Sequence, residues 1–159
     1  MASIKLLTSD GEVVRADLEA MRLSNVIRHM LDNLGACKAD EEECVLPLLN
    51  IDGPTMKKVI EWCDHHKNDP VVEKPVACDD FHKIHKLQDV AVGEWDENFF
   101  NVDVASLKKL TMAANFLDIE GMLDNSCKVI ASHIKGKSLD HMRKFFGVSK
   151  HPAHSIDVD

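Results

Sequence analysis

The sequence predicts an α+β protein in which a few short strands are followed by a larger set of helices. Three observations carry this prediction. Strand-like runs occur only before residue 50, amphipathic helical periods dominate the rest, and the composition is that of a globular chain, with 45% hydrophobic and 29% charged residues. The 159 residues suffice for one domain with a sizeable core, or for one domain with a short helical extension.

The N-terminus is predicted to form a β-hairpin. The runs SIKLLT (3–8) and EVVRA (12–16) flank Asp10-Gly11. Glycine adopts the positive φ of a tight hairpin turn at no steric cost, so this pair between two apolar runs favours two antiparallel strands.

A helix is expected from Ser24, a typical N-cap residue, to Gly35, a typical end. The acidic run KADEEE (38–43) then indicates a solvated loop. The helix places its apolar residues on one face: Val26, Ile27, Met30, Leu31 and Leu34.

A third strand is predicted over CVLPLL (44–49). Pro47 places this strand at a sheet edge, because proline donates no hydrogen bond to a neighbouring strand. The next helix covers 53–67, with Pro54 in its first turn, where proline is tolerated. Its apolar face consists of Met56, Val59, Ile60 and Cys63.

Residues 68–94 have little regular pattern and contain Pro70 and Pro75, which predicts a long surface loop. A short helical run is expected inside it at 81–90. Large apolar side chains occur again in WDENFFNVD (95–103).

Two consecutive helical periods between residues 103 and 137 form the centre of the chain. Asp103 and Asp118 are the expected N-caps, and Gly136 suits the end of the second helix. The first apolar stripe is Val104, Leu107, Leu110, Ala114 and Leu117. The second is Ile119, Met122, Leu123, Cys127, Ile130, Ala131 and Ile134. Two interpretations stay open: a hairpin packed wholly on its own domain, or one whose apolar face partly serves another protein.

The chain closes with a short helix that Ser138 caps and Gly147 ends, followed by a tail, 148–159, that we expect to fray. The predicted organisation is therefore 1–67, a loop at 68–94, a return to the same domain at 95–118, a helical extension at 119–147, and the tail.

Charge and cysteine content argue against several classes of function. The net charge of −8 repels phosphate backbones, and no apolar run is long enough to span a bilayer, so neither nucleic acid nor membrane is expected as a partner. The five cysteines are odd in number and scattered, which favours free thiols in a reducing, intracellular compartment.

Catalytic and metal-binding motifs are not evident. Cys63, His65 and His66 cluster, but adjacent helical residues point about 100° apart and do not converge on one ion. Cys78, His82 and His85 have a spacing compatible with zinc, yet they fall in the predicted loop. Cys63 and Cys127 lie on apolar helix faces and are expected to be buried and inert. We therefore expect no catalytic residues, metal or cofactor.

Three segments carry a family resemblance: KKVIEWCDHHKNDP (57–70), WDENFFNVD (95–103) and MAANFLDIEGMLDNSCKVIASHIKGK (112–137). They resemble the S-phase kinase-associated protein 1 family, over roughly residues 3–147. The resemblance implies a BTB/POZ fold with a helical extension. It further implies a non-catalytic, cytoplasmic and nuclear adaptor that joins a cullin scaffold to F-box proteins in SCF-type ubiquitin ligases.

The resemblance also implies two binding surfaces. The cullin-facing patch would contain Asn115 and Phe116, an amide beside an aromatic ring, with Pro47, Leu48 and Asn50 as neighbours. The F-box patch would contain Leu107, Lys108, Thr111, Leu123, Cys127, Ile130, Ile134, Met142 and Phe145.

The chain departs from the family pattern in the F-box patch. Lys108 and Thr111 stand where the family usually has bulky apolar residues, and VSKHPAHSIDVD (148–159) stands in place of an acidic final helix. Losing two apolar contacts of about 1.5–3 kcal/mol each weakens binding by orders of magnitude if nothing replaces them. We therefore expect a divergent member with a restricted or altered set of F-box partners.

Two other functions remain open. The hairpin face could pair with itself in a structural homo-oligomer or homodimer, because an exposed apolar stripe rarely stays single. A metal-dependent or thiol enzyme ranks third.

Overall fold

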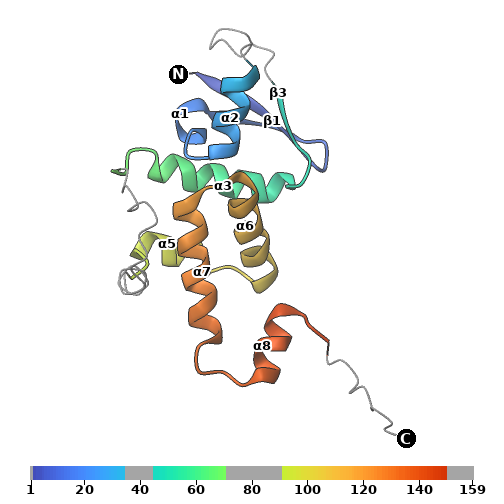
Figure 1. Ribbon diagram of the computed structural model, residues 1–159, viewed down its shortest axis with the longest axis vertical. Coiled ribbons are helices and arrows are strands. Elements are labelled where there is room, and N and C mark those ends of the chain that lie inside the picture. Colours follow the sequence, from blue (N-terminus) through green and yellow to red (C-terminus); the bar gives the residue numbers. More distant parts are fainter. Residues whose placement is uncertain (1, 35–44, 71–90, 150–159) are drawn as a thin grey trace, which may run out of the picture.

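The structure is a computed structural model, which describes residues 2–34, 45–70 and 91–149. A small sheet lies at one end with two helices, a third helix crosses the middle, and a helical hairpin extends to the far side (Figure 1). The helices are α1 (Leu18–Met21), α2 (Asn25–Leu34), α3 (Gly53–His66), α5 (Glu94–Phe99), α6 (Val104–Leu117), α7 (Glu120–Ile134) and α8 (Leu139–Phe146). The predicted α+β class is confirmed.

The sheet has the order β2-β1-β3. Strand β1 (Ser3–Thr8) pairs antiparallel with β2 (Val13–Asp17) and parallel with β3 (Val45–Leu48). Gly11 has φ +78°, which confirms the predicted hairpin turn. Pro47 lies in an edge strand, as the sequence predicts, because β3 pairs only with β1 within the described sheet.

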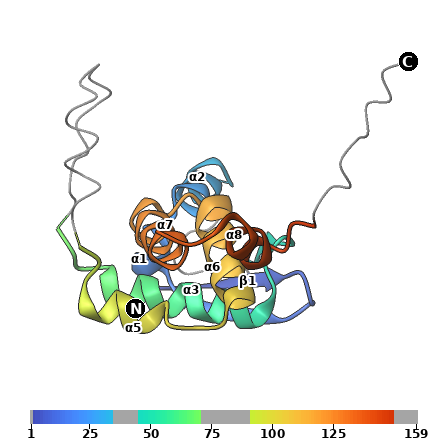
Figure 2. The ribbon, with the colours of Figure 1, turned by 90° about the horizontal axis from the view of Figure 1, so that it is seen from below.

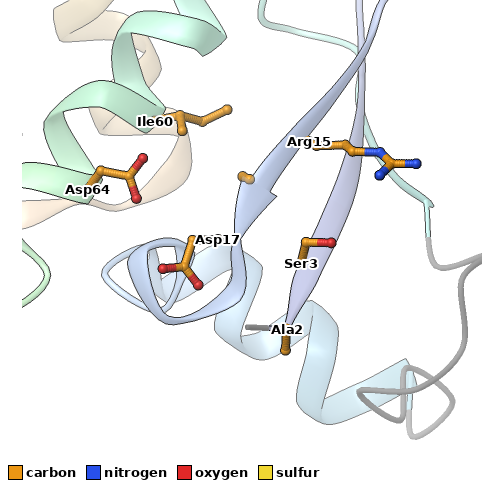
Figure 3. Close-up of a pocket in the computed structure, with 7 residues that line it drawn as sticks. Ala2, Ser3, Arg15, Asp17, Ile60 and Asp64 are labelled. Carbon is orange, nitrogen blue, oxygen red and sulfur yellow. The ribbon is translucent and has the colours of Figure 1, made fainter.

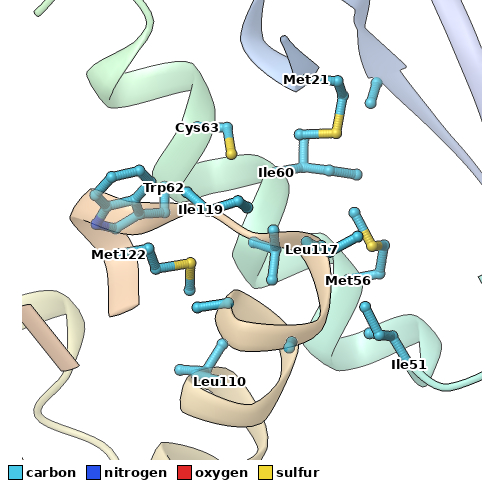
Figure 4. Packing of buried hydrophobic residues seen from close by; sticks show 14 of the residues in the cluster. Met21, Ile51, Met56, Ile60, Trp62, Cys63, Leu110, Leu117, Ile119 and Met122 are labelled. Carbon is cyan, nitrogen blue, oxygen red and sulfur yellow. The ribbon is translucent and has the colours of Figure 1, made fainter. Parts of the chain in front are cut away.

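Helix α3 forms the centre of the core. Asp52 caps its N-terminus by accepting a hydrogen bond from the Thr55 backbone N–H at 2.9 Å. The predicted inner face is confirmed, since Met56, Val59, Ile60 and Cys63 are all buried. Figure 4 shows Met56, Ile60 and Cys63 on the side of α3 that faces the turn of the hairpin. The hairpin residues labelled there are Leu117, Ile119 and Met122.

The turn between α6 and α7 differs from the prediction. Asp118 ends α6 in the left-handed conformation, with φ 51°, and its N–H bonds to carbonyls of α6; Ile119 is the N-cap of α7. Because the connection is so short, Asp118 completes the first helix and does not cap the second. The predicted caps Asp103 and Ser138 and the ends at Gly136 and Gly147 are confirmed.

The apolar stripes of the hairpin are only partly buried. In α6 the inner residues are buried, but Val104 is exposed. In α7 the stripe is covered at Ile119 and Met122; Leu123, Ile130 and Ile134 are half-buried, and Cys127 and Ala131 are exposed. Of the two interpretations left open, a hairpin packed wholly on its own domain does not hold for α7.

Two short helices were not expected from the sequence. Helix α1 precedes Ser24, and α5 contains Trp95 and Phe99. Gly35, the acidic run 38–43 and the helical run at 81–90 lie outside the described residues. Within the described ranges, no helix combines the length and apolarity that crossing a bilayer requires.

Candidate protein-binding surfaces

The first surface is the outer face of α6, defined by Met112, Asn115 and Phe116. Met112 is 66% exposed and Phe116 is 38% exposed, although both are apolar. Asn115 is exposed beside them. An aromatic ring and a thioether next to an amide form a small amphipathic patch of the kind found at interface centres.

The turn between β3 and α3 lies next to this helix. Lys109 of α6 donates a hydrogen bond to Asp52 at 2.7 Å. Pro47 and Asn50 are exposed, as a surface role requires. Leu48 is fully buried in the core, so its proposed place on the cullin-facing patch is wrong: alternation along β3 turns it inward.

Sequence reasoning missed Met112 and Leu49 in this region. Leu49 is 63% exposed at the end of β3. Helical phase could have identified Met112, because the buried Leu110 and Ala113 on either side of it fix the inner face of α6.

The second surface, the α7–α8 surface, is an apolar stripe on two helices. Its α7 members are spaced i, i+4, i+7 and i+11, which places them on one helix face. Beyond Ser126, α7 has no buried residue, and α8 has none at all. Its members are Leu123, Cys127, Ile130, Ile134, Met142 and Phe145.

The N-terminal half of α6 borders this surface at Lys108 and Thr111, both half-buried. The Thr111 hydroxyl donates to the Leu107 carbonyl at 2.9 Å, so its polar atom is satisfied within the helix. Leu107 is 1% exposed, and its expected F-box contact is therefore wrong: the side chain belongs to the chain's own core.

Helix α8 is held in place by its aromatic residue Phe145. The Phe145 ring stacks on His133 of α7 with a centroid separation of 5.8 Å. The Lys108 ammonium lies 5.7 Å from the same ring centroid. Helix α8 lies beyond the end of the hairpin that is farther from the sheet (Figure 1), and it is therefore seen in front of the hairpin in the view from below (Figure 2).

The two described cysteines differ in exposure. Cys63 is buried, as predicted, and that burial raises the pKa of its thiol to about 12, which disfavours the reactive thiolate. Cys127 is exposed, so the expectation of a buried thiol is wrong there. Partial desolvation, followed by the nearby Asp124, raises the pKa of the Cys127 thiol and lowers its reactivity at neutral pH.

The histidines at the end of α3 have structural partners. His65 stacks on Trp95 with a centroid separation of 3.8 Å, and His66 stacks on Trp62 at 4.1 Å. Asp96 accepts a hydrogen bond from Trp62 Nε1 at 2.7 Å. These contacts fix α5 to α3.

The described residues hold no group of side chains suited to a metal ion, and the hypothetical ligands Cys78, His82 and His85 lie outside them. A shallow hollow of about 270 Å³ opens between the sheet and α3 (Figure 3). Its carboxylate Asp17 is bound by Lys67 at 2.9 Å, which lowers the pKa of Asp17 and leaves it a poor base. The lining residues are Ala2, Ser3, Arg15, Ala16, Asp17, Ile60 and Asp64.

Comparison with known proteins adds a family assignment. Residues 2–68 match a POZ model described as "Skp1 family, tetramerisation domain", and residues 120–151 match one described as "Skp1 family, dimerisation domain". The first match supports the expected BTB/POZ fold.

Three relatives align with most of the chain. A "Skp1-related protein" of Caenorhabditis elegans is 39% identical, over 91% of this chain and 80% of its own length. Two fungal proteins carry the name "E3 ubiquitin ligase complex SCF subunit sconC". That of Arthroderma benhamiae is 40% identical, over 91% of this chain and 82% of its own; that of Arthroderma otae is 39% identical, over 92% and 83%.

Proposed function

The chain belongs to the Skp1 family, and on that basis we propose that it is the non-catalytic adaptor of an SCF-type cullin-RING ubiquitin ligase. In this role it binds the cullin scaffold with one surface and an F-box protein with another, and it transforms neither. The cytoplasm and the nucleus are the compartments that we propose for it.

The observation that carries this proposal is the incomplete cover of the hairpin. No residue in the second half of α7 or in α8 is fully buried. Ile130 and Phe145 pack only partly against the core, so the apolar stripe stays in contact with water. Burying a fully exposed aliphatic side chain contributes about 1.5–3 kcal/mol, so each half-buried member of the stripe still gains roughly half of that when a partner covers it. Several such side chains together make the stripe a binding surface for an apolar partner. The F-box protein occupies this surface.

The cullin binds the outer face of α6. Phe116 and Met112 supply apolar area, and Asn115 fixes the register of the contact. Pro47 and Asn50 extend the patch from the β3–α3 turn. Because this face and the α7–α8 surface use different residues, both partners are bound at once.

Two single-surface variants test this function. Asn115→Ala with Phe116→Ala should abolish binding of a cullin N-terminal domain and preserve binding of F-box domains, measured by isothermal titration calorimetry. Ile130→Glu with Ile134→Glu should abolish binding of F-box domains and preserve binding of the cullin N-terminal domain, because a carboxylate in an apolar interface carries a desolvation penalty. Wild-type protein that binds neither partner would refute the adaptor function.

Self-association is the second candidate function. The family model that matches residues 120–151 is described as a dimerisation domain, and the α7–α8 surface lies within it. Molar mass by light scattering across a hundredfold concentration range tests this. A dimer that persists in the presence of saturating F-box domain supports the structural homodimer over the adaptor.

A further inference from the structure

Lys108 is a cation set into an apolar surface. Its side chain is half-buried, and its ammonium lies 5.7 Å from the centroid of Phe145 and 5.8 Å from that of Phe146. Cation–π contacts of this kind hold an ammonium beside a ring without neutralising its charge. Within the described residues, no carboxylate forms an ion pair with Lys108.

The positive charge of the neighbouring Lys109, in contrast, is balanced by a carboxylate. Lys109 follows Lys108 in α6, but its side chain points to the β3–α3 turn, where Asp52 accepts its hydrogen bond at 2.7 Å. The carboxylate of Asp52 raises the pKa of Lys109. Two adjacent lysines thus differ: one has a carboxylate partner and the other faces the α7–α8 surface.

The surroundings of Lys108 are basic, although the whole chain carries a net charge of −8. Along residues 128–144, the one carboxylate is Asp140, which lies 3.6 Å from Arg143 in an exposed pair. The cationic side chains of that stretch are Lys128, Lys135, Lys137, Arg143 and Lys144. The part of the α7–α8 surface formed by residues 128–144 therefore carries more positive than negative side chains, whereas Glu120 and Asp124 lie in the first turns of α7.

We propose that Lys108 is a specificity-determining residue, which selects F-box proteins whose contacting segment carries carboxylates beside its apolar residues. The inference rests on the proposed adaptor function and names the chemistry of its partner. A carboxylate seated by Lys108 forms a partly desolvated ion pair, whereas a lysine or arginine there meets a like charge in a basic field.

The exposed aromatic and aliphatic groups around Lys108 supply the affinity. Phe146 is 45% exposed and Leu139 is 61% exposed at the edge of the same surface. The apolar stripe thus provides affinity for any amphipathic segment, and the charge of Lys108 discriminates among such segments. Recognition of this kind needs both attraction to one partner and repulsion of another.

The test compares matched charge variants on a set of F-box domains graded from acidic to basic. Dissociation constants are measured by isothermal titration calorimetry at low and moderate salt for wild type, Lys108→Gln, Lys108→Glu and Lys109→Gln. Lys109→Gln is the control, because it removes the same charge from the adjacent position. Circular dichroism of each variant confirms that the helices are retained.

We expect the wild type to bind acidic domains at least tenfold more tightly than basic ones, with a preference that shrinks as salt rises. Lys108→Gln should remove this preference, Lys108→Glu should reverse it, and Lys109→Gln should leave it intact.

Four outcomes overturn the inference. Equal losses for acidic and basic domains in Lys108→Gln would mean that Lys108 only positions α8. Equal loss of preference in Lys109→Gln would mean that overall charge, not this position, selects the partner. If F-box domains bind with no charge preference, the inference alone fails; if no F-box domain binds, the adaptor function fails with it.

Discussion

Asp96 is the residue on which the junction of three helices depends. It is 5% exposed and lies on α5, where it accepts hydrogen bonds from Trp62 of α3 at 2.7 Å and from Asn125 of α7 at 3.2 Å. His66 Nε2 lies 3.3 Å from the same carboxylate. A buried carboxylate is tolerated here because several donors surround it.

Replacing Asp96 therefore tests the junction. Asp96→Ala leaves the indole N–H of Trp62 without its acceptor, and we expect the free energy of unfolding to fall by about 1–3 kcal/mol. Asp96→Asn keeps an acceptor oxygen and should lose less. Urea unfolding monitored by tryptophan fluorescence measures both, and equal losses would show that the hydrogen bond to Trp62 contributes little.

Asp52 makes a second residue-scale link, and this one depends on pH. The ammonium of Lys109, followed by Thr55, lowers the pKa of Asp52 from its ordinary 3.8 to about 2. The folded protein thus keeps this carboxylate ionised at pH values where the unfolded chain protonates it. Its stabilisation is fully present above pH ~4 and is lost as the pH falls toward 2.

Asp52→Asn isolates this effect, because asparagine also caps helices well. We expect the free energy of unfolding to drop by about 0.5–1 kcal/mol at pH 7, since Lys109 is exposed to solvent. That difference should shrink between pH 4 and pH 3. Asp32→Asn on the exposed side of α2 is the control, and a difference that is independent of pH would contradict the assignment.

At the scale of elements, α7 shows what the sequence can and cannot predict. The periodicity of its apolar residues predicts the helix and the residues that share a face. It does not say what covers that face, because a core helix and a docking helix have the same period. The structure distinguishes them: the last fully buried apolar residue of α7 is Met122, the last buried residue is Ser126, and Leu123, Ile130 and Ile134 are half-buried.

Other errors of prediction have equally local causes. Helix α5 is only six residues long, and its partners lie far away in sequence: Trp95 stacks on His65, and Asp96 accepts a hydrogen bond from Trp62. The role of Asp118 depends on a connection of only two residues, in which Asp118 is the C-cap of α6 and Ile119 is the N-cap of α7. Caps that border longer loops, such as Asp103 and Ser138, are read correctly because their side chains act locally.

Cys127 offers a direct probe of α7. We expect N-ethylmaleimide to modify Cys127 in the folded protein and Cys63 only after unfolding, as read by mass spectrometry of peptides. Bound F-box domain should protect Cys127, whereas bound cullin domain should not. Protection by the cullin domain alone would contradict the proposed positions of the two surfaces.

Helix α8 is predicted to be the least protected of the helices that border the F-box surface. It has eight residues, none buried, and an isolated helix of that length is marginal in water. Phe145→Ala removes the ring that lies between Lys108 and His133. We expect hydrogen exchange of α8 to accelerate severalfold in this variant while α3 exchanges as before; unchanged exchange of α8 would show that another contact holds it.

At the scale of the whole molecule, the proposed function requires two surfaces that bind their partners independently of each other. The POZ-like part carries the β3–α3 turn and packs against α6, and the far half of the hairpin carries the stripe. The family resemblance predicts a binding protein, and the sequence spacing of Lys108 and Phe116 already places them about two helical turns apart on α6. The sequence alone does not reveal that Phe116 is exposed while Leu107 is buried in the core.

The most direct test of this account is native mass spectrometry of the chain mixed with an F-box domain and a cullin N-terminal domain. We predict a ternary complex with one copy of each protein. It should revert to the F-box pair with Asn115→Ala and Phe116→Ala, and to the cullin pair with Ile130→Glu and Ile134→Glu. Two partners that bind singly but exclude each other would contradict the account.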